Sequence, residues 1–81
     1  MDIKKVRWAC RRGMLELDVI LRPFVDGHYE SLTEFEKVVF VDLLTADDPE
    51  LFAWFMGHEE CKNEHFVKMI NKIHKLNGAV L

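Results

Sequence analysis

Apolar residues recur at intervals of three and four along almost the whole chain, which is the spacing that places side chains on one face of an α-helix. Val6 and Cys10 show this interval near the start, and Leu17 and Leu21 show it further on. No stretch of useful length has the two-residue alternation of a β-strand. The sequence therefore predicts an all-α fold, and its 81 residues are enough for one domain, 1–81, built as a compact bundle of about five short helices.

Residues typical of helix ends lie between the apolar stretches. We expect a first helix over residues 2–11, after which Gly13 would supply the left-handed backbone that closes it. A second helix should bend or stop near Arg22, because Pro23 lacks the N–H that a helix interior uses. Further signals define the later helices: a capping box over Thr33–Glu36, a start with Asp48 as the cap and Pro49 at the first helical position, a stop at Gly57, and a last helix between Asn63 and Asn77.

Charge is strongly segregated along a chain whose net charge is −3. Residues 1–12 carry an excess of four positive charges, residues 13–61 an excess of ten negative charges, and residues 62–81 an excess of three positive charges. The acidic centre would repel phosphates, so we expect no nucleic-acid partner. Such blocks are typical of solvated helix faces, and they also offer a protein partner patches of both signs.

Residues that could catalyse a reaction or hold a metal are few and poorly spaced. The segment His58–Lys62 departs from the zinc-protease pattern, because that pattern needs a second histidine at position 62. His58, Cys61 and His65 could surround a zinc ion, but helix-breaking residues separate them and no fourth ligand lies nearby in the sequence. Ser31 is the single serine, and no glycine-rich phosphate loop is present. We therefore predict no metal site and a protein that is not an enzyme.

The two cysteines and the short apolar runs indicate where in the cell the protein is located. Cys10 and Cys61 form no CxxC pair, which favours a reducing environment, and Cys10 lies on an apolar face where an inert buried thiol is expected. The longest apolar run, Leu51–Met56, is far shorter than the roughly 20 residues that span a bilayer. We expect a bacterial cytoplasmic protein that does not insert into a membrane. We also expect a monomer, because helix faces within one chain account for the apolar residues.

The segment Arg12-Gly13-Met14-Leu15-Glu16 interrupts the apolar pattern between the first two helices. As a helix junction, Gly13 would end the first helix, Arg12 would interact with its negative end, and Glu16 would lie in the positive first turn of the second. As a recognition patch, the same segment offers a bare backbone beside a guanidinium and a carboxylate, which suits docking onto another protein. Both interpretations fit the residues.

The sequence resembles a known protein family over about residues 5–60. The stretches that carry the resemblance are WACRRGMLELD followed by RPF, YESLTEFEKVVFVDLL, and DDPELFAWFMGH. They are similar to the succinate dehydrogenase flavinylation and assembly factors, the SdhE family of small five-helix proteins, whose RGxxE motif is specific in this context. Residues 61–81 match only as a final helix.

The resemblance implies an assembly factor that promotes covalent attachment of FAD to a histidine of the succinate dehydrogenase flavoprotein subunit, and in related bacteria of fumarate reductase. The client would then supply the nucleophile, and this chain would bind the client. The family motif falls on Arg12, Gly13 and Glu16, and we add Arg11 and Asp18 as neighbours that share the exposed patch. The chain has no dinucleotide fingerprint, so we expect free FAD to bind it weakly or not at all.

A second hypothesis comes from family members that have carried an antitoxin label, which implies a regulatory protein that binds a membrane-associated toxin or its target. On either hypothesis, five residues are assigned to the fold: Trp8, Pro23, Asp48, Pro49 and Trp54.

We expect Arg12→Lys and Glu16→Ala to melt close to the wild-type protein if these side chains serve docking. A larger residue at position 13 should add strain, because the backbone there is expected to be left-handed.

Overall fold

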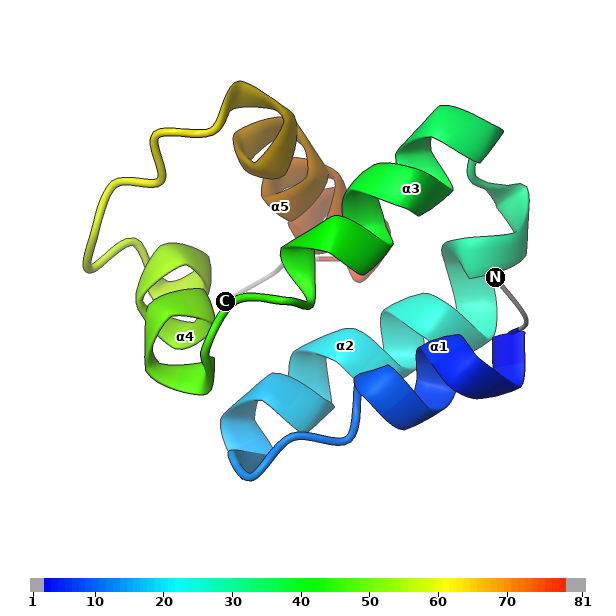
Figure 1. Cartoon of the computed structure of the whole chain (residues 1–81), viewed down its shortest axis with the longest axis horizontal. Helices are drawn as coiled ribbons and strands as arrows, with labels where there is room; N and C mark the ends of the chain where they lie inside the picture. The colour runs from blue at the N-terminus through cyan, green and yellow to red at the C-terminus, as the bar shows by residue number, and fades with distance from the viewer. Residues whose placement is uncertain (1–2, 79–81) are drawn as a thin grey trace.

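A computed structural model describes residues 3–78 and places five α-helices and one short 3₁₀-helix within them. The elements are α1 (Ile3–Ala9), α2 (Leu15–His28), η1 (Tyr29–Ser31), α3 (Glu34–Leu43), α4 (Asp48–Met56) and α5 (Glu64–Leu76). The longest helix, α2, contacts α1, α4 and α5, while α3 packs across α5 (Figure 1). The predicted all-α bundle is confirmed. No helix within residues 3–78 is long and apolar enough to cross a membrane.

One core fills the space between these helices. Its largest fully buried side chains are aromatic, namely Phe24 of α2, Tyr29 of η1 and Phe40 of α3. The ring centroids of Phe24 and Phe40 are 5.3 Å apart, and those of Tyr29 and Phe40 are 5.8 Å apart. Tilted ring pairs of this kind contribute about 0.5–1.5 kcal/mol each beyond the burial of their area. No charged side chain among residues 3–78 is buried.

The helix ends follow the sequence signals in the second half of the chain. Thr33 and Glu36 form the predicted capping box, in which each backbone N–H donates to the other residue's side chain. Lys72 of α5 also donates to Glu36, and this hydrogen bond is the main reason that the pKa of the Glu36 carboxyl is lowered. Gly57 ends α4 with a φ of 74°, and the Asn63 side chain caps α5. These three predictions are confirmed.

Helix α2 contradicts the expected break near Arg22, because it continues through Pro23 to His28. The proline removes one N–H, so the carbonyl of Val19 loses its helical partner. Val19 and Pro23 both face solvent, where water can bond that carbonyl. The prediction of a stop was wrong because the missing hydrogen bond falls on the exposed side of the helix.

The first helix is shorter than expected, and its end is built differently. It spans Ile3–Ala9, and the part of the prediction that falls on residue 2 lies outside the described residues. Gly13 is not in the left-handed region, so it does not close the helix as expected. Asp48 was expected to cap α4, but the N-cap is Asp47. The Asp48 carboxylate instead contacts the segment between α1 and α2.

Two tryptophans assigned to the fold have different surroundings. Trp54 is half-buried, packs against the core and lies with its ring centroid 6.0 Å from that of Phe66, which confirms its assignment. Trp8 is 69% exposed and lies outside the core, so its assignment to the fold was wrong. The apolar spacing of α1 could not reveal this, because Val6 and Cys10 already fill the buried face of that short segment.

The two cysteines differ enough in burial for a chemical test. Burial raises the pKa of the Cys10 thiol to about 12, whereas Cys61 lies partly exposed in the loop before α5. We expect one thiol per native chain to react with a thiol reagent at pH 8, and two after denaturation. A Cys61→Ser variant should show no fast reaction while folded. Rapid labelling of Cys10 in the folded variant would contradict the buried position.

Candidate functional site

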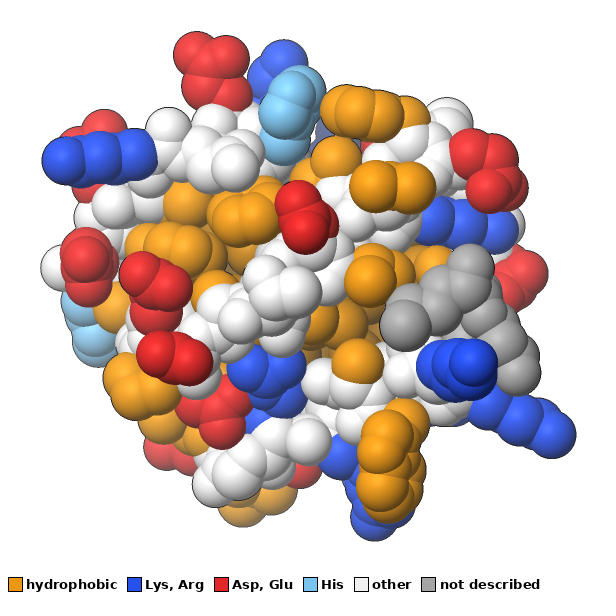
Figure 2. Space-filling view, in the orientation of Figure 1, with side chains coloured by type: hydrophobic (Ala, Val, Ile, Leu, Met, Phe, Trp, Pro, Cys, Tyr) orange, Lys and Arg blue, Asp and Glu red, His pale blue; other side chains and the backbone are white. Residues whose placement is uncertain are grey.

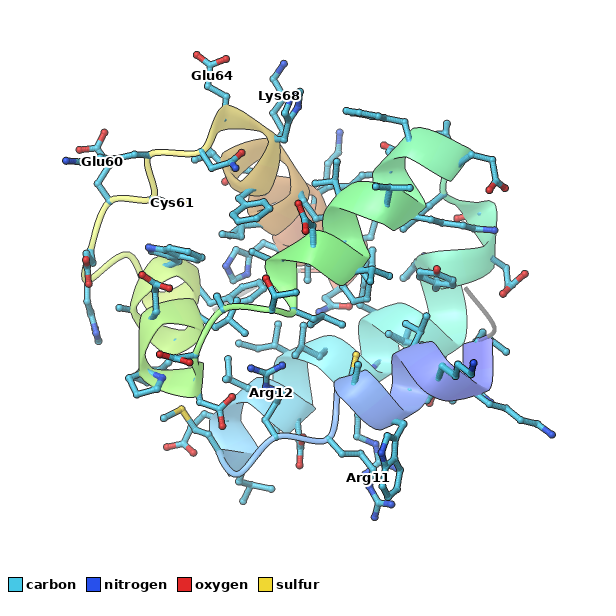
Figure 3. The ribbon with its side chains drawn as sticks, viewed as in Figure 1. Arg11, Arg12, Glu60, Cys61, Glu64 and Lys68 are labelled. Atoms are coloured by element: carbon cyan, nitrogen blue, oxygen red, sulfur yellow. The ribbon has the colours of Figure 1, made fainter. Side chains whose placement is uncertain are left out.

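The segment that links α1 to α2 is held from inside by Arg12. Its side chain points into the molecule, toward the loop before α4 (Figure 3). Nη1 donates to the carbonyls of Leu44 at 2.7 Å and Ala9 at 3.3 Å, and Nη2 donates to the carbonyl of Ala46 at 2.6 Å. Nε donates to Asp48 Oδ1 at 2.5 Å. Four of the five guanidinium N–H groups are therefore used within the chain.

Asp48 completes this corner from the first turn of α4. Its Oδ1 accepts from Arg12, and its Oδ2 accepts from the backbone N–H of Gly13 at 3.1 Å. The Arg12 and Asp48 side chains are only 15% and 27% exposed, so solvent screens the pair less than a surface ion pair. Asp18 of α2 accepts weakly from the Arg12 backbone N–H at 3.4 Å. Three helices thus fix the backbone that carries the motif.

Gly13 lies at the surface of this corner without a conformational need for glycine. Its φ is not in the left-handed region, and a Cβ built on it would meet Asp48 Oδ2 at 3.7 Å, an ordinary contact distance. The expected strain from a larger residue was therefore wrong. Neither backbone nor packing demands glycine here, and the bare surface that glycine leaves is the feature that the recognition interpretation uses.

The other motif side chains face outward. Arg11 points away from the bundle, and its guanidinium lies 5.1 Å from the centroid of the exposed Trp8 ring (Figure 3). Glu16 is exposed in the first turn of α2 and forms no hydrogen bond or ion pair with the residues that the structure describes. Leu15 and Val19, one helical turn apart, are 73% and 66% exposed. Sequence reasoning missed these two, because their spacing is that of a buried stripe.

We call the exposed part of this corner the junction face, formed by Arg11, Gly13, Leu15, Glu16 and Val19. It combines a cation, a carboxylate, a bare backbone and two apolar side chains on a rigid support. The structure thus divides the predicted site in two. Arg12 and the half-buried Asp18 hold the corner, so they do not share the exposed patch as expected. Because the Arg12 guanidinium has four acceptors within the chain, we now expect Arg12→Lys to melt below the wild-type protein.

No group of three or more metal-ligating side chains lies together within residues 3–78. The thiol nearest to the motif in sequence, Cys10, is buried and has a raised pKa, which makes it a poor nucleophile. The junction face itself offers groups suited to recognition: charged side chains at Arg11 and Glu16, and exposed apolar side chains at Leu15 and Val19.

The fold and this site together define a small all-α protein with an exposed face of charged and apolar groups, a surface suited to contact with another protein. Residues 4–77 match the family described as "Flavinator of succinate dehydrogenase". The chain belongs to this family, which confirms the resemblance drawn from its motifs.

Individual relatives agree with this membership. The FAD assembly factor SdhE of Shewanella oneidensis is 56% identical over 73 residues, which cover 90% of this chain and 89% of that protein. The FAD assembly factor SdhE of Idiomarina loihiensis is 59% identical over 69 residues, which cover 85% of this chain and 77% of that protein. The solution structure of a UPF0350 protein matches with a TM-score of 0.75 and 51% identity, covering 94% of this chain and 81% of that one.

Proposed function

We propose that this protein is an assembly factor that binds the flavoprotein subunit of succinate dehydrogenase and promotes covalent attachment of FAD to it. The family and the relatives named above support this function, and nothing among them favours the antitoxin hypothesis. The observation that carries the proposal is the junction face: its motif is exposed on a hydrogen-bonded corner, the backbone at position 13 does not require glycine, and the Glu16 side chain has no hydrogen bond or ion pair with residues 3–78.

Under this proposal, the chain acts by binding its client and not by covalent chemistry. The reacting groups are the flavin and a histidine of the client, and the assembly factor holds the client in a conformation where the two meet. Restricting two groups to a reactive arrangement contributes to rate without any nucleophile from the helper. The rigid support of the junction face suits this task, because a fixed surface loses little entropy when it binds.

Each motif residue has a separate role in the proposed contact. Arg11 and Glu16 pair with opposite charges on the client, and Gly13 lets the client backbone approach closely. Arg12 and Asp18 are positioning residues, because they act on the client through the corner that they hold. We further propose that the protein is a cytoplasmic monomer and that the fumarate reductase flavoprotein is a second client. These extensions draw on the family resemblance and on the apolar core that one chain completes.

The test uses a bacterial strain that lacks the gene for this protein. Covalent flavin on the dehydrogenase subunit is measured by in-gel fluorescence, with the total amount of subunit measured by immunoblot. The fluorescence should fall sharply in the deletion strain and return when the wild-type gene is restored. Unchanged covalent flavin in the deletion strain would contradict the proposed function. A pull-down of the tagged protein from cells that recovers mainly a small membrane protein would contradict it as well.

Binding of free FAD offers a second measurement. We expect no tight site, because the junction face has no glycine-rich turn at a helix N-terminus to hold a diphosphate. Titration of FAD fluorescence with the purified protein should show no quenching at micromolar concentrations. A dissociation constant of a micromolar or less would contradict this expectation and show that the protein itself has a site for FAD.

A further inference from the structure

A cleft of about 300 Å³ lies between α1 and α2, beside the junction face. Asp26 is the single carboxylate that lines it. Four cationic side chains also line it, namely Lys4, Arg7, Arg11 and Arg22. The cleft therefore has an excess of three positive charges in a chain whose net charge is −3. Figure 2 shows cationic side chains gathered over α1, while carboxylates gather over α4.

Contacts within the chain leave two of these cations, Arg7 and Arg22, able to bind a ligand. Arg7 Nε pairs with Asp26 Oδ1 at 3.0 Å, but the two side chains are 54% and 59% exposed. Such an exposed pair contributes only about 0.2–1 kcal/mol, so a ligand can replace it at little cost. Arg22 forms no hydrogen bond or ion pair with residues 3–78. Arginine forks match carboxylates in a bidentate geometry, so the cleft is suited to carboxylate ligands.

Trp8 indicates what kind of molecule carries those carboxylates. It lines the same cleft, and its large apolar ring is 69% exposed. Tryptophan and arginine are the residues most enriched at the energetic centres of protein interfaces. Lys4, Arg7 and Trp8 share one face of α1, which is seven residues or about 10 Å long. That length matches about three residues of an extended peptide.

We propose that the cleft between α1 and α2 binds an acidic segment of the client flavoprotein, with carboxylates on the cations and an apolar side chain against Trp8. The proposal rests on the proposed function and extends its interface. Arg11 belongs to both surfaces, so a client on the junction face reaches the cleft without a gap. The positive charge of the cleft also attracts the acidic segment before contact, which raises the association rate at low salt.

The experiment compares two double variants with the same change of charge. Lys4→Glu with Arg22→Glu reverses the cleft, and Lys68→Glu with Lys75→Glu reverses two exposed lysines of α5, where Lys68 points away from the bundle (Figure 3). Binding to the purified, FAD-free flavoprotein subunit is measured by interferometry. The cleft variant should bind at least tenfold more weakly, and the α5 variant within twofold of wild type. The difference should shrink in 0.5 M salt.

Other outcomes overturn the proposal in distinguishable ways. Equal losses in both variants would mean a diffuse charge effect. A normal cleft variant beside a non-binding Glu16→Ala variant would reject the cleft and retain the proposed function. Wild-type protein that fails to bind the subunit would reject the function itself. Displacement of the client by micromolar pyrophosphate would assign the cleft to a small phosphate.

A zero-length crosslink identifies the segment directly. Carbodiimide joins a lysine amine to a carboxylate that it touches, so Lys4 should couple to an acidic peptide of the client. Mass spectrometry then locates the peptide. Lys4→Arg should keep the affinity but lose this crosslink. A Lys4 crosslink that never forms in a complex of wild-type protein would contradict the acidic segment.

Discussion

Arg12→Ala should lower the free energy of unfolding by about 2–4 kcal/mol, which is a large share of the total for a chain of this length. The change removes the donors for Leu44 and Ala46 and leaves the Asp48 carboxylate without its cation. Unpaired, partly buried acceptors cost more than the hydrogen bonds themselves contribute. Thermal unfolding followed by circular dichroism should show a melting temperature lower by about 10–25 °C.

The neighbouring arginine is the matched control. Arg11→Ala removes the same side chain from an exposed position, where a stacking contact with Trp8 is worth only about 0.5–1 kcal/mol. Arg12→Lys should fall between the two, because a single ammonium cannot reach acceptors on the α3–α4 loop and on α4 together. Arg12→Ala melting within about 3 °C of wild type would show that the corner does not depend on this side chain.

Features that depend on a few neighbouring residues could be predicted from the sequence. The capping box of Thr33 and Glu36, the stop at Gly57 and the cap at Asn63 each join groups within one turn of chain, so their residue types are sufficient signals. The short helix η1 has no such signal and was not predicted. Pro23 predicted a helix end near Arg22, but α2 continues through it because the lost hydrogen bond lies on the exposed side of the helix.

The site was predicted less completely, because its geometry joins distant residues. Arg12 and Asp48 are 36 positions apart, and no local pattern pairs them. Sequence reasoning therefore placed Arg12 on the docking surface and Asp48 in a helix cap, although the two form one internal corner. The exposed residues Leu15 and Val19 were missed for a related reason: which face of α2 is covered depends on where α4 and α5 pack.

Glu16→Ala should reduce covalent flavin on the client at least tenfold while leaving the protein folded. The carboxylate is exposed and has no partner within residues 3–78, so its removal costs no more than the helix-start effect of about 0.3–1 kcal/mol. The loss of function would instead come from an unpaired cation in the client interface, where such losses are large. In-gel flavin fluorescence in the complemented deletion strain measures covalent flavin on the client, and thermal unfolding measures the stability of the variant.

Glu34→Ala is the matched control for this variant, because Glu34 lies in the first turn of α3, at the opposite end of the bundle from the start of α2 (Figure 1). It should lose the same helix-start contribution together with an exposed 3.9 Å ion pair to Lys37, and it should restore flavinylation fully. Gly13→Leu provides an independent probe: a Cβ fits beside Asp48, so the fold should tolerate it while the added side chain blocks close approach of the client. Full flavinylation with both Glu16→Ala and Gly13→Leu would move the docking surface away from the motif and leave Arg12-Gly13-Met14-Leu15-Glu16 as a structural corner.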